Sequence, residues 1–275
     1  MGAVRPPTWL DELDLHAGPP EAAMGTRGLD PARWFLVDDE WAAQRAMAAS
    51  MVSRRRADVV AGSAGEAAAV LEREVATWLG VDVGIDDAGS DDSDPLVRAR
   101  LHVADDLCLL TPSGRADGWV LAAGCVCFPS YWRLTDKIGR PLSFVHAPVP
   151  GYPGALAARV DAFLSRLRAD GRGVWRRNWS IHRTDALFVP THEPGGAMPA
   201  VEDRWLRSEY QTLRRLPDVD AIVFTIRTQQ VRLAALADRA DIRHAMAAAV
   251  RGWTPAQRAY KGGAVDDALL AWLER

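Results

Sequence analysis

The residues best suited to chemistry lie in one unusual stretch, from Cys125 to Gly154, which reads CVCFPSYWRLTDKIGRPLSFVHAPVPGYPG. His146 precedes two prolines, Pro148 and Pro150. Because residues before proline avoid the helical region, we expect an extended, rigid loop after this histidine. An imidazole held in this way loses little freedom on binding a metal, and imidazole is a common ligand of iron and zinc. The pattern makes His146 a candidate metal ligand, with a hydrogen-bonded loop histidine as the simpler interpretation.

Other cofactor chemistries have weaker support in the sequence. His182 and His192 are the candidates for joining His146 around zinc, but their separations match no zinc motif. Cys125 and Cys127 share one strand face and are interpreted as small buried hydrophobic residues. The three cysteines are too few for the four thiolates of a typical [2Fe–2S] cluster. There is also no dinucleotide fingerprint, phosphate loop or nucleophile elbow. Electrons for any redox reaction would therefore come from another chain.

Two further segments carry polar side chains on expected strands. Residues 175–179 read WRRNW, in which an arginine can hold a carboxylate while an indole packs on a flat ligand. An exposed edge strand explains the same pattern. Residues 206–213 read LRSEYQTL, which as a strand places Arg207, Glu209 and Gln211 on one face, either a polar cavity wall or a solvated surface. Arg227 likewise lies either in a polar cavity wall or on a solvated surface, and its apolar neighbours in the strand favour burial.

The elements expected to position these residues suggest an α+β fold. Hydrophobic periodicity predicts a first helix that starts after Asp38 or Asp39, either of which can cap it, and runs toward Arg56. It also predicts helices over 66–79 and 156–167 and in the tail from 233, and strands over 106–111, 119–128, 174–181 and 222–228. Residues 205–216 would also suit a helix, but we favour a strand paired with 222–228. The order indicates an antiparallel sheet covered by helices, with helical N- and C-terminal extensions.

The domain organisation expected from composition is simple. Residues 1–30 are rich in proline and glycine and are expected on the surface, whereas 31–275 form one domain. Residues 84–94 form an acidic loop, interpreted as a flexible insertion.

Composition also limits the partners and the compartment. The net charge of −3 and the interspersed charges give no basic face for nucleic acid. No apolar run approaches the ~20 residues of a membrane span. The odd number of cysteines and the lack of a secretory signal indicate a cytoplasmic protein.

Nine segments in order resemble the α subunit of the haem-dependent oxidative N-demethylases, also called dimethylamine monooxygenases. They cover roughly residues 24 to 230 and read MGTRGLD (24–30), DDLC (105–108), CFPSYW (127–132), KIGRPL (137–142), HAPVPG (146–151), RNW (177–179), LRSE (206–209), QTLRRLP (211–217) and FTIRT (224–228). The sequence departs from the family pattern at Tyr210 and Gln229.

The resemblance implies a PAS-like fold that binds haem b through a histidine, and His146 is the histidine inside a matching motif. It also implies NADPH-driven oxidation of a small secondary amine such as dimethylamine, with O2, to a primary amine and formaldehyde. The implied partners are a reductase subunit with FMN and a [2Fe–2S] cluster and a folate-binding subunit whose tetrahydrofolate takes up the formaldehyde.

Roles for further residues follow from the needs of this chemistry. Haem propionates need cationic partners, for which Arg177, Arg207 and Arg140 are the candidates, and Trp179 is a candidate for packing on the haem. Bound O2 and an ammonium substrate need a cation, an anion and a hydroxyl, for which Arg227, Glu209 and Tyr131 are the candidates.

Two readings compete with an enzyme subunit. One is a haem-based gas or redox sensor without turnover, which should be joined to an output domain for which this chain has no obvious room. The other is a family member without haem that serves as a scaffold for its partners.

Overall fold

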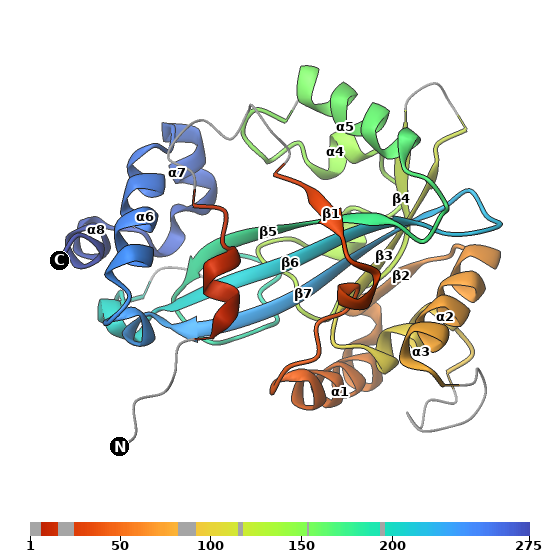
Figure 1. The fold of residues 1–275 in the computed structure, drawn as a ribbon, viewed down its shortest axis with the longest axis horizontal. Coiled ribbons are helices and arrows are strands. Elements are labelled where there is room, and N and C mark those ends of the chain that lie inside the picture. The colour runs from red at the N-terminus through yellow and green to blue at the C-terminus, as the bar shows by residue number, and fades with distance from the viewer. Residues whose placement is uncertain (1–6, 16–24, 82–91, 115–117, 153, 193–195) are drawn as a thin grey trace.

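An antiparallel sheet of seven strands runs through the centre of the structure, in the order β1-β5-β6-β7-β3-β4-β2 (Figure 1). The structure is a computed structural model that describes residues 7–15, 25–81, 92–114, 118–152, 154–192 and 196–275. The strands are β1 (Arg27–Leu29), β2 (Val60–Gly62), β3 (Asp106–Pro112), β4 (Trp119–Cys125), β5 (Gly173–His182), β6 (Trp205–Arg215) and β7 (Ile222–Arg232). This is the α+β fold predicted from the sequence.

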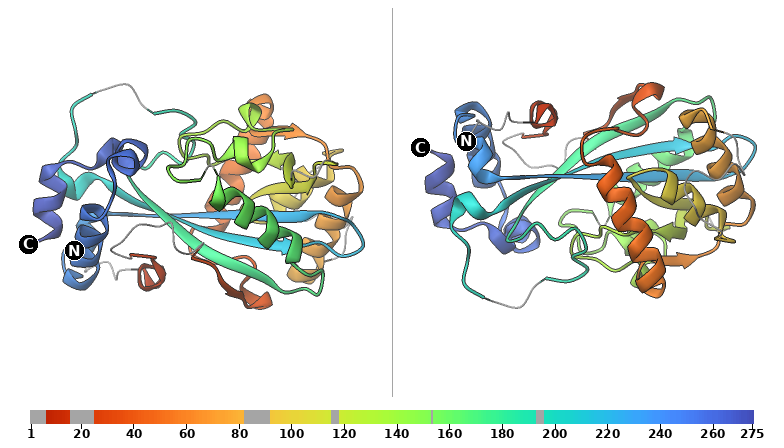
Figure 2. Two further views of the ribbon diagram at one scale, coloured as in Figure 1. Left: turned by 90° about the horizontal axis from the view of Figure 1, so that it is seen from above. Right: turned by 90° about the horizontal axis from the view of Figure 1, so that it is seen from below.

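The helices pack in three groups around the sheet. They are α1 (Trp41–Val59), α2 (Glu66–Leu79), α3 (Pro95–His102), α4 (Leu142–Val145), α5 (Ala155–Arg166), α6 (Ala240–Arg251), α7 (Pro255–Lys261) and α8 (Asp267–Leu273), with 3-10 turns at η1 (Thr8–Glu12), η3 (Pro31–Arg33), η4 (Leu134–Asp136), η5 (Val201–Asp203), η6 (Leu233–Leu236) and η7 (Gly262–Ala264). Helices α1 to α3 lie on one side of the sheet, α4 and α5 on the other, and α6 to α8 at one end (Figures 1 and 2).

The long hairpin of β6 and β7 supplies most of the central sheet. Trp205 pairs with Arg232 and Arg215 with Ile222, so the two strands match along their whole length. This confirms a strand, and not a helix, over the ambiguous 205–216 segment. The helices predicted over 66–79 and 156–167 are confirmed as α2 and α5. Helix α1 corresponds to the first predicted helix but begins at Trp41 and extends to Val59.

The N-terminal segment is partly buried. Trp9, Leu10 and Leu13 pack with residues of α6 and α8 in a hydrophobic cluster, although the sequence analysis places residues 1–30 on the surface. The acidic loop proposed over 84–94 falls mostly outside the described residues. Within the described part of the chain, no helix is long and apolar enough to cross a membrane.

Gly62 ends β2 at a close approach to β4, and this predicts a sharp effect of substitution. Its φ is +81°, and a Cβ there would lie 2.1 Å from the Ala122 carbonyl oxygen, which is backbone and cannot move aside. We expect Gly62→Ala to lower the free energy of unfolding by more than about 2 kcal/mol, since strain and overlap add. Gly80→Ala is the control, because Gly80 also has positive φ but open space around it. Equal losses in chemical denaturation would contradict this explanation.

Candidate functional site

His146 lies at the C-terminal end of the short helix α4, and its ring is fixed by two neighbours. Its Nδ1 lies 3.0 Å from the Leu142 carbonyl oxygen, and its ring stacks on Tyr152 with the centroids 4.4 Å apart. A carbonyl oxygen only accepts, so Nδ1 carries the proton, and Nε2 is left with a lone pair. Metal-bound histidines usually have this arrangement, with the second ring nitrogen donating to a carbonyl or carboxylate.

The environment of His146 favours its neutral form. Burial is the largest cause that lowers the pKa of His146, and the cations Arg176 and Lys137 lower it further, against the hydrogen bond to Leu142. A neutral imidazole is the form that binds a metal. The backbone after it differs from our expectation, because residues 146–152 form consecutive turns, with hydrogen bonds such as Val149 N to His146 O, and not an extended loop.

The sheet face nearest to this histidine carries a row of polar side chains. Strand pairing places Arg176 beside Gln211, Asn178 beside Glu209, and Ser180 beside Arg207. We call these six residues the polar strip. Five of them are half-buried and Arg207 is buried, whereas the alternating residues of β6 on the opposite face, from Ser208 to Arg214, are all buried. The predicted shared face of Arg207, Glu209 and Gln211 is therefore confirmed, and most of the strip remains accessible.

Glu209 is the carboxylate at the centre of the polar strip. Its oxygens lie 3.6 Å from Arg207 Nε and 3.0 Å from Gln211 Nε2, which donates to it. Arg207 is fully buried and donates mainly to the Leu187 and Phe128 carbonyl oxygens. These contacts hold the carboxylate in one place on the sheet.

Two cations at the other end of the polar strip were missed in the sequence analysis. The charge of Arg176 lowers the pKa of His146, whereas the matching motif had favoured the neighbouring Arg177. Lys261, at the end of α7, donates to Asn178 Oδ1 at 3.0 Å and to the Trp179 carbonyl oxygen at 3.3 Å. Strand alternation within WRRNW allowed either arginine to face the site, but no sequence pattern indicated the tail lysine.

Tyr131 lies at the far end of the same face, between two histidine rings. It stacks on His182 and His192 with centroid distances of 4.8 and 4.2 Å, and its hydroxyl lies 3.4 Å from His182 Nδ1. Its φ of +61° is unusual for a residue with a side chain. Burial lowers the pKa of His182 to about 3, so this ring is neutral. His182 and His146 stack on different tyrosines, Tyr131 and Tyr152 respectively.

Arg177, Trp179 and Arg227 lie on the opposite face of the sheet from the polar strip. The pairing of Arg177 and of Arg227 with Tyr210 places both arginines on the face that is covered by α1 and the N-terminal segment. Arg177 is bound by Glu12, and Arg227 by Gln44 and Asp38.

The same face holds the indole of Trp179, which packs against Trp253 and donates to the Asp14 carbonyl oxygen. The structure thus does not bring these three predicted site residues together with His146 and Glu209. Tyr210 and Gln229, where the sequence departs from the family pattern, also contact Arg177 there.

Arg140 is exposed, close in sequence to α4. Its guanidinium lies 5.0 Å from the ring centroid of Phe144, which is itself exposed. This contact does not direct Arg140 toward His146, so its proposed role at a propionate has no support in the geometry.

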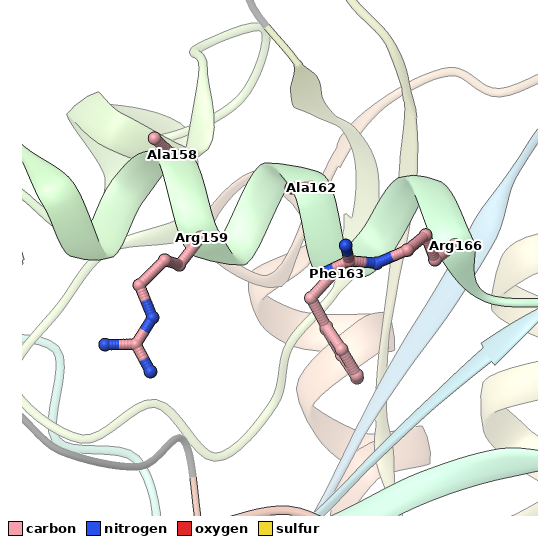
Figure 3. Close-up of a pocket in the computed structure, with 5 residues that line it drawn as sticks. All are labelled: Ala158, Arg159, Ala162, Phe163 and Arg166. Atoms are coloured by element: carbon pink, nitrogen blue, oxygen red, sulfur yellow. The ribbon is translucent and has the colours of Figure 1, made fainter.

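Two surface hollows lie away from the polar strip. One, of about 440 Å³, lies along α5, where Arg159 and Phe163 project from one side of the helix (Figure 3). The other, of about 290 Å³, is lined mainly by 62–65 and 93–96. Neither is lined by His146 or a strip residue.

The described residues offer no cluster of three or more side chains for a metal ion, which leaves the zinc alternative without support there. A haem iron needs only one axial side chain from the protein, so this finding does not bear on haem. The three cysteines are buried and unpaired, as expected.

Comparison with known proteins identifies the family. The family model described as haem-dependent oxidative N-demethylase, alpha subunit-like, matches residues 73–270. The match includes α4, the polar strip and α7. A comparison with curated proteins finds no match. Since the matched residues make up most of the chain, the protein belongs to the haem-dependent oxidative N-demethylase, alpha subunit-like family.

Proposed function

We propose that this chain binds haem b in a PAS-like domain, with His146 Nε2 as the axial ligand, and oxidises the methyl group of a small secondary amine. One observation carries the proposal: a neutral imidazole, oriented by the Leu142 carbonyl, whose second nitrogen makes no hydrogen bond with a described residue. The donor set fits haem, because an axial imidazole and nearby cations are what iron and its propionates require.

Haem, when bound, supplies the activation of O2 that oxidises the methyl carbon. The net reaction consumes a secondary amine, O2, NADPH and a proton and yields a primary amine, formaldehyde, water and NADP+. The family description, alpha subunit-like, supports a chain that works with other subunits. We assign the FMN and [2Fe–2S] cluster to a reductase partner and tetrahydrofolate to a folate-binding partner, with the complex in the cytoplasm.

Glu209 is our candidate for binding the amine. A secondary amine is an ammonium ion at neutral pH, and a carboxylate held by Arg207 and Gln211 offers it an oriented acceptor. The side chain is 12% exposed, so a ligand reaches it from the strip side. We keep Tyr131 as the candidate hydroxyl, because it lies near Arg207. The buried contacts of Arg227 support a structural role for that residue.

Turnover by the reduced protein tests this function. Reduced protein supplied with O2 and secondary amines is expected to release formaldehyde. Glu209→Gln should lower formaldehyde release at least about tenfold, because the loss of one charge-assisted hydrogen bond to the amine corresponds to about that factor. The haem content of the variant should stay unchanged. Glu202→Gln is the control, because Glu202 is 51% exposed on η5.

Two results would contradict the proposal. Gas binding without formaldehyde from any amine would favour a sensor. Parallel loss of haem and turnover in Glu209→Gln would remove this residue from amine binding.

A further inference from the structure

Arg176 differs from the buried arginines of this fold. Its guanidinium makes no hydrogen bond or ion pair with any described residue, although the side chain is mostly covered and burial lowers its pKa. The buried arginines all donate to at least one protein oxygen, namely Arg100, Arg177, Arg204, Arg207, Arg214, Arg227 and Arg243. Arg176 is half-buried on the accessible side of the strip, and a guanidinium there can bind an anion that the described residues do not supply.

Lys261 brings a second cation to the same place. Its ammonium group has three N–H donors, and two of them are used by Asn178 Oδ1 and the Trp179 carbonyl oxygen. Burial, and then the nearby Arg176, lower the pKa of Lys261 to about 8. Two cations that disfavour each other's charge are kept close together by strand β5 and by the end of α7.

The strip carboxylate Glu209 does not neutralise this pair by contact. It attracts Arg176 and Lys261 by its charge, but no hydrogen bond or ion pair joins it to either side chain in the described part of the chain. Glu209 is in addition engaged by Arg207, at 3.6 Å, and by Gln211. The arrangement therefore leaves positive charge in excess at one end of the strip, next to His146.

We propose that Arg176 and Lys261 form a carboxylate-binding pair that receives an acidic group of the ligand bound beside His146. The assignment rests on the proposed function, which places haem there. Haem carries two propionate carboxylates, and a planar guanidinium binds a carboxylate through two parallel hydrogen bonds. A carboxylate on the amine substrate has the same chemistry and is the other source of the anion.

Titration of the full-length apo-protein with ferric haem and with haem dimethyl ester, whose carboxylates are blocked, tests the pair. The Soret band reports binding without any need for turnover. We expect wild type to bind haem roughly ten- to a hundredfold more tightly than the ester, and Arg176→Gln to lose this preference. Arg176→Lys keeps the positive charge but should lose part of the preference for haem over the ester. Lys261→Gln should lose a similar part of this preference. Arg172→Gln is the control, since Arg172 is an exposed arginine before β5. Far-UV circular dichroism checks that each variant is folded.

The outcomes separate this inference from the proposed function. In one outcome, His146→Ala loses haem binding while Arg176→Gln and Lys261→Gln keep the wild-type preference for haem over the ester. This result overturns the propionate as the source of the carboxylate and leaves the proposed function standing.

Titration of the haem-bound protein with N-methylglycine and with dimethylamine then tests a carboxylate on the substrate. A Soret shift that only N-methylglycine gives, and only with Arg176 present, supports a substrate carboxylate. Equal Soret shifts with the two amines, or no shift with either, overturn the carboxylate-binding role of Arg176 and Lys261. If folded Arg176→Gln loses the preference but His146→Ala binds haem normally, the axial assignment fails and the pair stands. If wild type binds neither porphyrin, both fail.

Discussion

The His146→Ala protein is expected to lose most of the Soret absorbance that wild type shows after reconstitution with haem. Removal of the imidazole removes the axial bond, whereas Tyr152 and the Leu142 carbonyl, which hold the ring, stay in place. Loss of an outer-shell partner of a metal ligand typically costs ten- to a hundredfold in metal affinity, so loss of the ligand itself should exceed about a hundredfold. Absorbance titration with haem measures this directly.

Two companion variants make the test of His146 specific. His192→Ala removes an exposed histidine that stacks on Tyr131 and should leave the spectrum unchanged. His146→Gly leaves space for free imidazole, which should restore the band at millimolar concentrations. An unchanged spectrum in His146→Ala, or equal losses in His192→Ala, would show that the iron is held elsewhere.

The sequence was sufficient for the five long strands, β3 to β7, although not for the short strands β1 and β2. It was also sufficient for the shared face of Arg207, Glu209 and Gln211, because alternation in a strand fixes which side chains share a face. It was not sufficient to choose between Arg176 and Arg177. That choice depends on which face of the sheet receives α4, and packing over a long sequence separation decides it. The matching motif pointed to Arg177, which the fold uses to bind Glu12.

Arg227 and Lys261 show the same limit. Arg227 was expected to be buried, and it is, but its partners Gln44 and Asp38 lie far away in the sequence and on the face opposite Glu209. Lys261 reaches the strip because η7 and the end of α7 pack beside β5. Local patterns therefore predicted the elements well, whereas the composition of the site depended on tertiary contacts.

Two neighbouring aspartates at the start of β3 should respond in opposite ways to removal of their charge. Asp106 is fully buried and accepts hydrogen bonds from Arg100 and from the Cys127 and Phe128 amides. Asp105 is equally buried, but neither of its oxygens has a hydrogen-bond partner in the described structure. Burial is the largest cause that raises the pKa of Asp105 from 3.8 to about 7, against the attraction of Arg227 and Arg100.

Asp105 should therefore make stability depend on pH. A raised pKa in the folded state means that folding takes up a proton above pH 3.8, so stability is full below that pH and falls as the pH rises toward about 7. The loss reaches at most roughly 4 kcal/mol above pH 7, since each pKa unit corresponds to about 1.4 kcal/mol.

Asp105→Asn should remove this dependence and unfold at higher denaturant concentration than wild type at pH 8, with little difference at pH 4. Asp106→Asn is the matched control, and it should be less stable than wild type by roughly 3–5 kcal/mol at pH 8, because it leaves the Arg100 charge uncompensated. Denaturant unfolding of the three proteins at pH 4, 6 and 8 measures both effects. A constant difference in the free energy of unfolding between Asp105→Asn and wild type from pH 4 to pH 8 would contradict this prediction. It would show that Asp105 does not change its protonation in this range. The attraction of Arg227 and Arg100 would then outweigh the effect of burial on this carboxylate.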